Sequence, residues 1–116
     1  MTDVTIYHNP RCGKSRQTLD LLRQQGIEPT VVEYLKTPLD AARLKALLRQ
    51  LGLRPRDLMR AKEDAYTALG LDDPSLTDDQ LIAAIAATPM LMERPVVTRN
   101  GKAAIGRPPE AVLAIL

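Results

Sequence analysis

Apolar residues in the first third of the chain change their spacing twice. A run of β-branched and aromatic residues at 4–7 stops at Asn9-Pro10, as a buried strand does. Apolar residues then recur at three- and four-residue steps, which predicts a helix that ends near Gly26. The run 30–34 is strand-like again. This order of strand, helix and strand predicts a right-handed parallel crossover.

The middle of the chain has the pattern of several helices. Leucines at three- and four-residue spacing predict the first helix, and a capping-box sequence at Thr77 and Gln80 predicts the start of the last one. The predicted helices lie at about 40–51, 56–60, 64–69 and 77–88. We expect this helical insertion to occupy about 38–90 of a single domain that spans 1–116.

The last third of the chain returns to the strand pattern. Short apolar runs at 95–98 and 103–105 flank Asn100-Gly101, a strong hairpin sequence, so these two strands are expected to be antiparallel. The proline-rich segment 106–110 predicts the start of a final helix. The resulting order, β-α-β, helices, then β-β-α, predicts an α/β fold with a four-stranded mixed sheet and helices packed on it, as found in thioredoxin-like folds.

Composition narrows the functional classes. The 116 residues carry a net charge of +2, which is too small for the broad basic surface of a nucleic-acid binder, and the only aromatic residues are three tyrosines. No apolar stretch has the form of a signal peptide or the length of a membrane span. A single cysteine suits a reducing compartment. We therefore expect a cytoplasmic protein without nucleic-acid or membrane partners.

The single cysteine carries the strongest chemical signal in the chain. Cys12 lies between the first predicted strand and the first predicted helix, so the unpaired N–H groups and the dipole of that helix favour its thiolate. The same N–H groups can bind an oxyanion. Core packing is the ordinary role of a free cysteine, but a loop that carries Arg11 and Lys14 disfavours burial. We therefore interpret Cys12 as a reactive thiol at the ligand-binding edge of the sheet.

Resident metal or cofactor chemistry has no support in the sequence. The chain has one cysteine and one histidine, no cluster of them has metal-site spacing, and we expect neither a metal nor a bound cofactor. Met59, Met90 and Met92 are interpreted as flexible core residues. Because position 15 is a serine, Cys12 has no C-x-x-C partner. Any oxidised form of Cys12 therefore has to be resolved by an external thiol.

Four motifs occur in a specific order along nearly the whole chain. They are His8-Asn9-Pro10 with Cys12-Gly13-Lys14-Ser15-Arg16, then Leu58-Met59-Arg60, then Met92-Glu93-Arg94-Pro95, and finally Gly106-Arg107-Pro108. Together they resemble the glutaredoxin-linked arsenate reductase (ArsC) family, whose fold is thioredoxin-like. The resemblance implies that the protein reduces arsenate to arsenite with Cys12 as the nucleophile. It also implies glutathione as the external thiol reductant and glutaredoxin as a partner.

The resemblance assigns further roles around the thiol. Three arginines match the family's substrate-binding positions, although each taken alone would most often be a surface charge: Arg60, Arg94 and Arg107. Guanidinium groups bind two oxygens of an oxyanion at once. The supporting positions are His8, Asn9, Gly13, Ser15 and Pro95.

Three of the supporting positions carry specific expectations. We expect Ser15 to hydrogen-bond the thiolate and the Arg94-Pro95 peptide bond to be cis. His8 has two open roles, a structural hydrogen bond at the strand end or, when protonated, stabilisation of the thiolate by charge.

Two other functions remain open from the sequence. The same activated thiol and anion-binding surround would serve a general thiol redox protein that forms mixed disulfides with glutathione. A branch of the same fold binds RNA polymerase as a regulator without arsenate reductase activity. Members of that branch commonly carry a C-x-x-C redox switch, which Ser15 prevents here.

Overall fold

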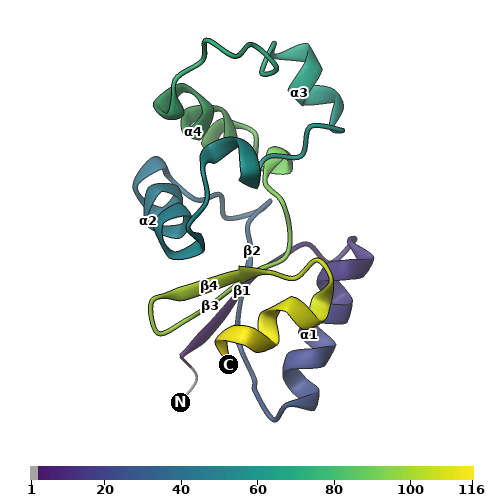
Figure 1. The fold of residues 1–116 in the computed structure, drawn as a ribbon. Coiled ribbons are helices and arrows are strands. Elements are labelled where there is room, and N and C mark those ends of the chain that lie inside the picture. The colour runs from purple at the N-terminus through teal and green to yellow at the C-terminus, as the bar shows by residue number, and fades with distance from the viewer. Residues whose placement is uncertain (1–2) are drawn as a thin grey trace. The chain divides into compact units, whose positions relative to one another are not determined.

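Four strands form one mixed sheet in the computed structural model, which describes residues 3–116 (Figure 1). The strands, in the spatial order β2-β1-β3-β4, are β1 (Val4–His8), β2 (Thr30–Glu33), β3 (Val96–Arg99) and β4 (Lys102–Ile105). β1 is parallel to β2 and antiparallel to β3, and β3 is antiparallel to β4. The predicted four-stranded mixed sheet is therefore confirmed.

The hairpin between β3 and β4 follows from its two turn residues. Arg99 pairs with Lys102, so only Asn100 and Gly101 form the loop. Their φ angles are 52° and 77°. Two consecutive positive φ values belong to the hairpin turn that asparagine followed by glycine favours.

Two helices cover one face of the sheet. α1 (Gly13–Gln24) joins β1 to β2, and the C-terminal helix η3 (Pro109–Ile115) packs beside α1 (Figure 1). The buried side chains that they share with β1 and β3 are Val4, Ile6, Leu22, Val97 and Val112. Alternation along β1 places His8 on the same face as Val4 and Ile6, and so on the side of α1.

The final helix differs in type from the α-helix expected from the sequence. η3 is a 3₁₀ helix, in which Ala111 N–H donates to the carbonyl of Pro108, three residues earlier, at 3.0 Å. Pro108 and Pro109 have no backbone N–H, so they supply no donor at the start of the helix.

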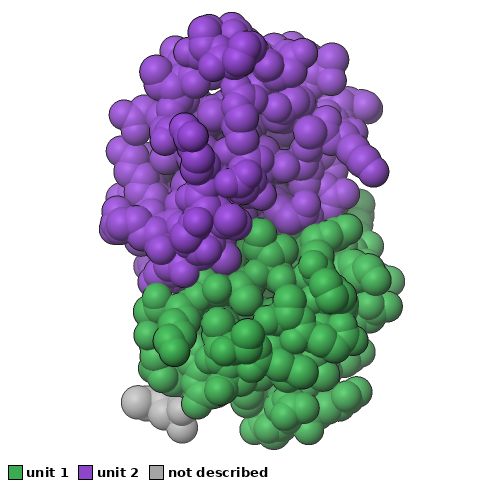
Figure 2. Space-filling model, in the orientation of Figure 1, with its two compact units in different colours: residues 1–37, 94–116 green, residues 38–93 purple. Residues whose placement is uncertain are grey.

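The described chain divides into two compact units (Figure 2). The sheet unit combines the residues up to Thr37 with Arg94–Leu116, and the helical unit is Pro38–Glu93. The helical insertion expected at about 38–90 lies within the helical unit. None of the helices described in residues 3–116 combines the length and the apolar character needed to cross a membrane.

The helical unit contains α-helices and short 3₁₀ helices whose ends are set by local hydrogen bonds. They are α2 (Ala41–Leu51), η1 (Pro55–Leu58), α3 (Asp64–Ala68), α4 (Asp78–Ala87) and η2 (Pro89–Leu91). The carboxylate of Asp40 accepts the Arg43 N–H at 2.8 Å and caps α2. The predicted capping box at α4 is present, with reciprocal hydrogen bonds between Thr77 and Gln80.

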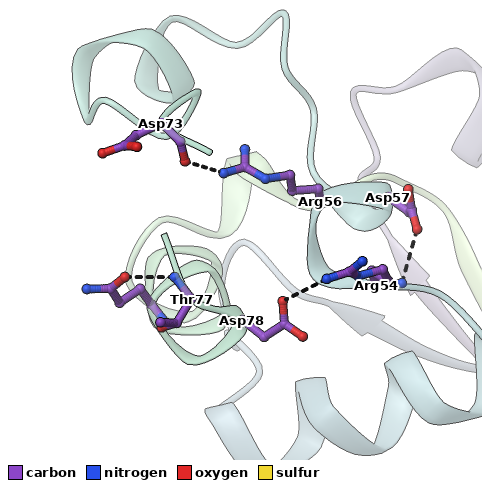
Figure 3. A network of polar contacts seen from close by, with 7 residues as sticks. Arg54, Arg56, Asp57, Asp73, Thr77 and Asp78 are labelled. Atoms are coloured by element: carbon purple, nitrogen blue, oxygen red, sulfur yellow. Dashed lines mark hydrogen bonds and ion pairs between the residues drawn. The ribbon is translucent and has the colours of Figure 1, made fainter. Parts of the chain in front are cut away.

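Arg56 ties the loop after α3 to η1 (Figure 3). Its Nη1 donates to the Tyr66 hydroxyl at 3.0 Å and to the Leu71 carbonyl at 2.7 Å, and its Nη2 donates to the Asp73 carbonyl at 2.5 Å. The side chain is partly buried and supplies hydrogen-bond donors to backbone carbonyls of this loop.

The methionines have two different environments. Met59 and Met92 are buried and pair with each other in an isolated antiparallel bridge, so their predicted core role is confirmed. Met90 is 47% exposed, and its predicted core role is wrong. It lies in η2, where its neighbour Leu91 is the residue turned into the core.

Gly106 permits the close approach of β4 to α1, and an alanine there should destabilise the sheet unit. A Cβ at Gly106 would lie 2.5 Å from Thr18 Oγ1 and 2.8 Å from Pro95 Cγ. Both neighbours are buried, and Thr18 Oγ1 donates to the Lys14 carbonyl at 2.8 Å. We expect Gly106→Ala to lower the free energy of unfolding by about 1–3 kcal/mol, measured by urea denaturation.

Gly13→Ala is the matched control. Its added Cβ would meet only Arg16 Nη2, at 4.0 Å. An alanine is also favoured over glycine in a helix, so the control should be neutral or stabilising. Equal losses in the two variants would contradict the packing argument.

Candidate active site

Cys12 is placed by the junction between β1 and α1. It is the N-cap residue of α1, with φ −91° and ψ 123°, and its thiol is partly exposed. Its backbone N–H donates to the Asn9 carbonyl at 3.0 Å, and its carbonyl accepts the Arg16 N–H at 3.0 Å. The Arg16 side chain also donates to the Pro10 carbonyl at 3.1 Å. The loop therefore holds the sulfur at the start of the helix, as the sequence predicted.

Ser15 holds the loop from inside the first turn of α1. It is fully buried, its Oγ lies 2.5 Å from His8 Nδ1, and the same Oγ accepts the Asn9 N–H at 3.0 Å. Asn9 Oδ1 in turn accepts the Arg11 N–H at 3.0 Å. The expected bond from the Ser15 hydroxyl to the thiolate is therefore not the one observed. The Ser15 hydroxyl forms hydrogen bonds with His8 and Asn9. Ser15 stabilises the thiolate through its backbone N–H.

The pKa of the Cys12 thiol is lowered from its ordinary value. Burial acts in the opposite direction and raises it, but hydrogen bonding of the thiolate outweighs burial. The donors are the Ser15 backbone N–H, the Arg94 side chain and the Lys14 backbone N–H, and the positive charge of Arg94 adds to them. The site therefore favours the nucleophilic form of the sulfur.

His8 is held in its neutral form. Burial lowers its pKa from 6.5, the charge of Glu33 acts in the opposite direction, and Arg23 and Arg16 lower it further. Near pH 7 the imidazole is therefore uncharged. Of the two roles left open by the sequence, the geometry favours the structural hydrogen bond, here to Ser15, over stabilisation of the thiolate by charge.

Arg94 and Arg107 both lie at the sulfur. Arg107 Nη1 is 4.0 Å from Cys12 Sγ and donates to the Arg94 carbonyl at 3.2 Å. Arg94 is buried, whereas Arg107 is exposed. The Arg94-Pro95 peptide bond is cis, as predicted, and the Arg107-Pro108 bond is also cis, which the sequence did not lead us to expect. Segments far apart in the sequence thus bring two cations to one thiol.

Arg60 belongs to the helical unit, where two carboxylates hold it. Its Nε lies 3.3 Å from Glu63 Oε1 and its Nη1 lies 3.6 Å from Glu93 Oε1. Neither glutamate has a role that its sequence motif predicts. The i, i+3 spacing of Arg60 and Glu63 is a signal that could have predicted the first pair. No local signal predicts the second, because it depends on the bridge between Met59 and Met92.

Residues 3–116 contain no group of three or more histidine, cysteine or acidic side chains arranged to hold a metal ion. What the described residues of the site bring together is an activated thiol next to oxyanion-binding groups. Those groups are guanidinium ions and helix N–H donors.

A family model described as the ArsC family matches residues 7–115. The uncharacterized protein YfgD of Escherichia coli K12 is 60% identical over 114 residues, which cover 97% of this chain and 96% of that protein. An arsenate reductase of Neisseria meningitidis serogroup A is 52% identical over 117 residues, with both chains fully covered.

A solved structure of an arsenate reductase has the same fold as this chain. An arsenate reductase from Vibrio cholerae superposes with a TM-score of 0.96 at 55% identity, covering 97% of each chain. The predicted thioredoxin-like fold is thereby confirmed. Since the family model spans nearly all of the sequence and relatives above half identity match over nearly their full lengths, this protein belongs to the ArsC family.

Proposed function

We propose that this protein is an arsenate reductase that uses the Cys12 thiolate as its nucleophile. The observation that carries the proposal is the lowered pKa of Cys12 at the start of α1, with Arg107 Nη1 4.0 Å from the sulfur. The relatives named arsenate reductase, at 52% and 55% identity, support arsenate as the substrate.

Charge explains why the site suits this reaction. Arsenate is a tetrahedral oxyanion, and a thiolate that attacks it is negatively charged as well. Cations must therefore compensate both partners, and arginine does so at any relevant pH with paired N–H donors. Arg94 and Arg107 supply this charge beside the sulfur, and Arg60 is the third substrate-binding arginine in the proposal.

The single cysteine determines how the cycle ends. Cys12 forms a sulfur–arsenic bond, and one arsenate oxygen leaves as water after protonation. Attack by a glutathione thiol then forms a sulfur–sulfur bond with Cys12, and the two thiols supply the two electrons that convert arsenate to arsenite. The chain has no second cysteine, so the resulting mixed disulfide has to be reduced from outside. Glutaredoxin is the proposed reductant, in the reducing cytoplasm.

Replacement of the nucleophile tests the proposed reaction. We expect the wild-type protein to form arsenite from arsenate in the presence of glutathione and glutaredoxin, and Cys12→Ser to form none above background. A serine hydroxyl is far less acidic than a thiol, and it cannot form the disulfide whose formation from two thiols supplies the two electrons. Arsenite is measured directly, for example by chromatography coupled to elemental detection.

The same assay distinguishes arsenate reduction from general thiol redox activity. Omission of glutathione should stop turnover, because the chain cannot complete a disulfide by itself. Reduction of a small mixed disulfide without any arsenite formation would contradict arsenate reduction and favour a general thiol redox protein.

The lowered thiol pKa gives a second prediction. The rate of Cys12 alkylation by iodoacetamide should rise with pH around a midpoint below about 8.5, the value for an ordinary cysteine. Arg94→Met removes both a hydrogen bond to the thiolate and a positive charge, so its midpoint should move upward. The slower alkylation of Arg94→Met at pH 7 is the simplest readout.

Arg11→Met is the control for the loss of one charge. Arg11 is exposed in the same loop and is not among the groups that act on the thiol pKa. Its midpoint should stay close to that of the wild type. A midpoint near 8.5 in folded wild-type protein would refute the activated thiol.

A further inference from the structure

The guanidinium of Arg16 is held against the loop that carries the thiol. Arg16 is an exposed residue of α1, and its Nη1 donates to the Pro10 carbonyl at 3.1 Å. Its Nη2 is the atom that a Cβ added to Gly13 would meet, at 4.0 Å. Pro10 lies in the turn that Cys12 closes when its N–H donates to the Asn9 carbonyl. The guanidinium therefore contacts the chain on both sides of Cys12, within the sheet unit.

This orientation leaves Arg16 without an acidic partner. Asp20 follows it by four residues on α1, the spacing at which oppositely charged side chains pair on a helix. The Arg16 side chain extends toward the start of the helix instead, and no acidic side chain among residues 3–116 forms an ion pair with it. Arg23, on the same helix, pairs with Glu28 at 3.1 Å. The thiol loop thus carries a fixed cation that no described carboxylate compensates.

We propose that Arg16 binds a carboxylate of glutathione and so directs the glutathione thiol to Cys12. The inference deepens the proposed function, in which glutathione is the external thiol, and rests on it. Glutathione carries a carboxylate at each end and its thiol between them, so a carboxylate can pair with a cation beside the sulfur that the thiol attacks. A guanidinium has more N–H donors than the single bond to Pro10 uses, and the others suit a carboxylate. Arg16 is then a specificity-determining residue for the external thiol.

Thiol–disulfide exchange tests this inference without arsenate. The Cys12 thiolate attacks one sulfur of glutathione disulfide, a mixed disulfide with Cys12 forms, and one glutathione thiolate leaves. 2-Hydroxyethyl disulfide undergoes the same exchange but has no carboxylate. We expect Arg16→Met to slow the reaction with glutathione disulfide by about two- to fivefold, the range for an exposed ion pair, with the loss confined to that disulfide. Mass spectrometry of the intact protein follows both reactions.

Two comparisons isolate the contact with Arg16. Arg11→Met removes the same charge from the same loop, but the Arg11 side chain is exposed and no contact among residues 3–116 fixes it there. It should slow the reaction with glutathione disulfide less than Arg16→Met does. High salt should reduce the difference between the wild type and Arg16→Met, because screening weakens the attraction that only the wild type retains.

The outcomes separate the inference from the proposed function. Equal losses with both disulfides would mean that Arg16 only holds the loop, and equal losses in Arg11→Met would mean a general effect of charge; either result overturns the inference. If the wild type forms arsenite and Arg16→Met exchanges at the wild-type rate, the inference is wrong and the proposed function stands. If the exchange rates are as expected but no arsenite forms, arsenate reduction fails and Arg16 remains a glutathione-binding residue.

Discussion

Stabilisation of the Cys12 thiolate by the first turn of α1 is the interaction on which the rest of the site depends. Burial alone would raise the pKa of this thiol, and the Ser15 and Lys14 N–H groups together with Arg94 reverse that effect. These donors act only if the turn keeps its position relative to the loop. The hydrogen bonds of Cys12 with Asn9 and Arg16, and of Ser15 with His8 and Asn9, fix that position.

Burial restricts the hydrogen-bond partners of the Ser15 side chain. A fully buried hydroxyl has to find hydrogen-bond partners within the protein, and here they are the His8 ring and the Asn9 N–H. The contribution of Ser15 to the thiolate therefore comes from its backbone N–H, which any residue except proline could supply. Serine is nonetheless specific at this position, since its hydroxyl links the end of β1 to the first turn of α1.

The strands, the helix boundaries and the position of Cys12 at the start of α1 were predictable because they depend on local patterns. Asn100-Gly101 and the Thr77 capping box each encode a turn or a helix start within a few residues. Arg56 and Glu93 were not, because their roles depend on partners brought together by the fold. Arg56 reaches carbonyls 15 and 17 residues away, and Glu93 meets Arg60 only through the Met59–Met92 bridge. The 3₁₀ form of η3 was missed as well, since apolar spacing does not separate three-residue from four-residue hydrogen bonding.

The lowered thiol pKa matters for both halves of the proposed cycle. It raises the fraction of Cys12 that is present as the thiolate, the form that attacks arsenic. It also makes Cys12 the better leaving group once it is held in a disulfide, because a thiol of lower pKa departs faster. A chain with one cysteine depends on an outside thiol for that second step. The hydrogen-bond donors and the positive charge that lower the pKa of Cys12 therefore also assist its departure from the mixed disulfide. The same groups serve both steps in a chain that has no second cysteine.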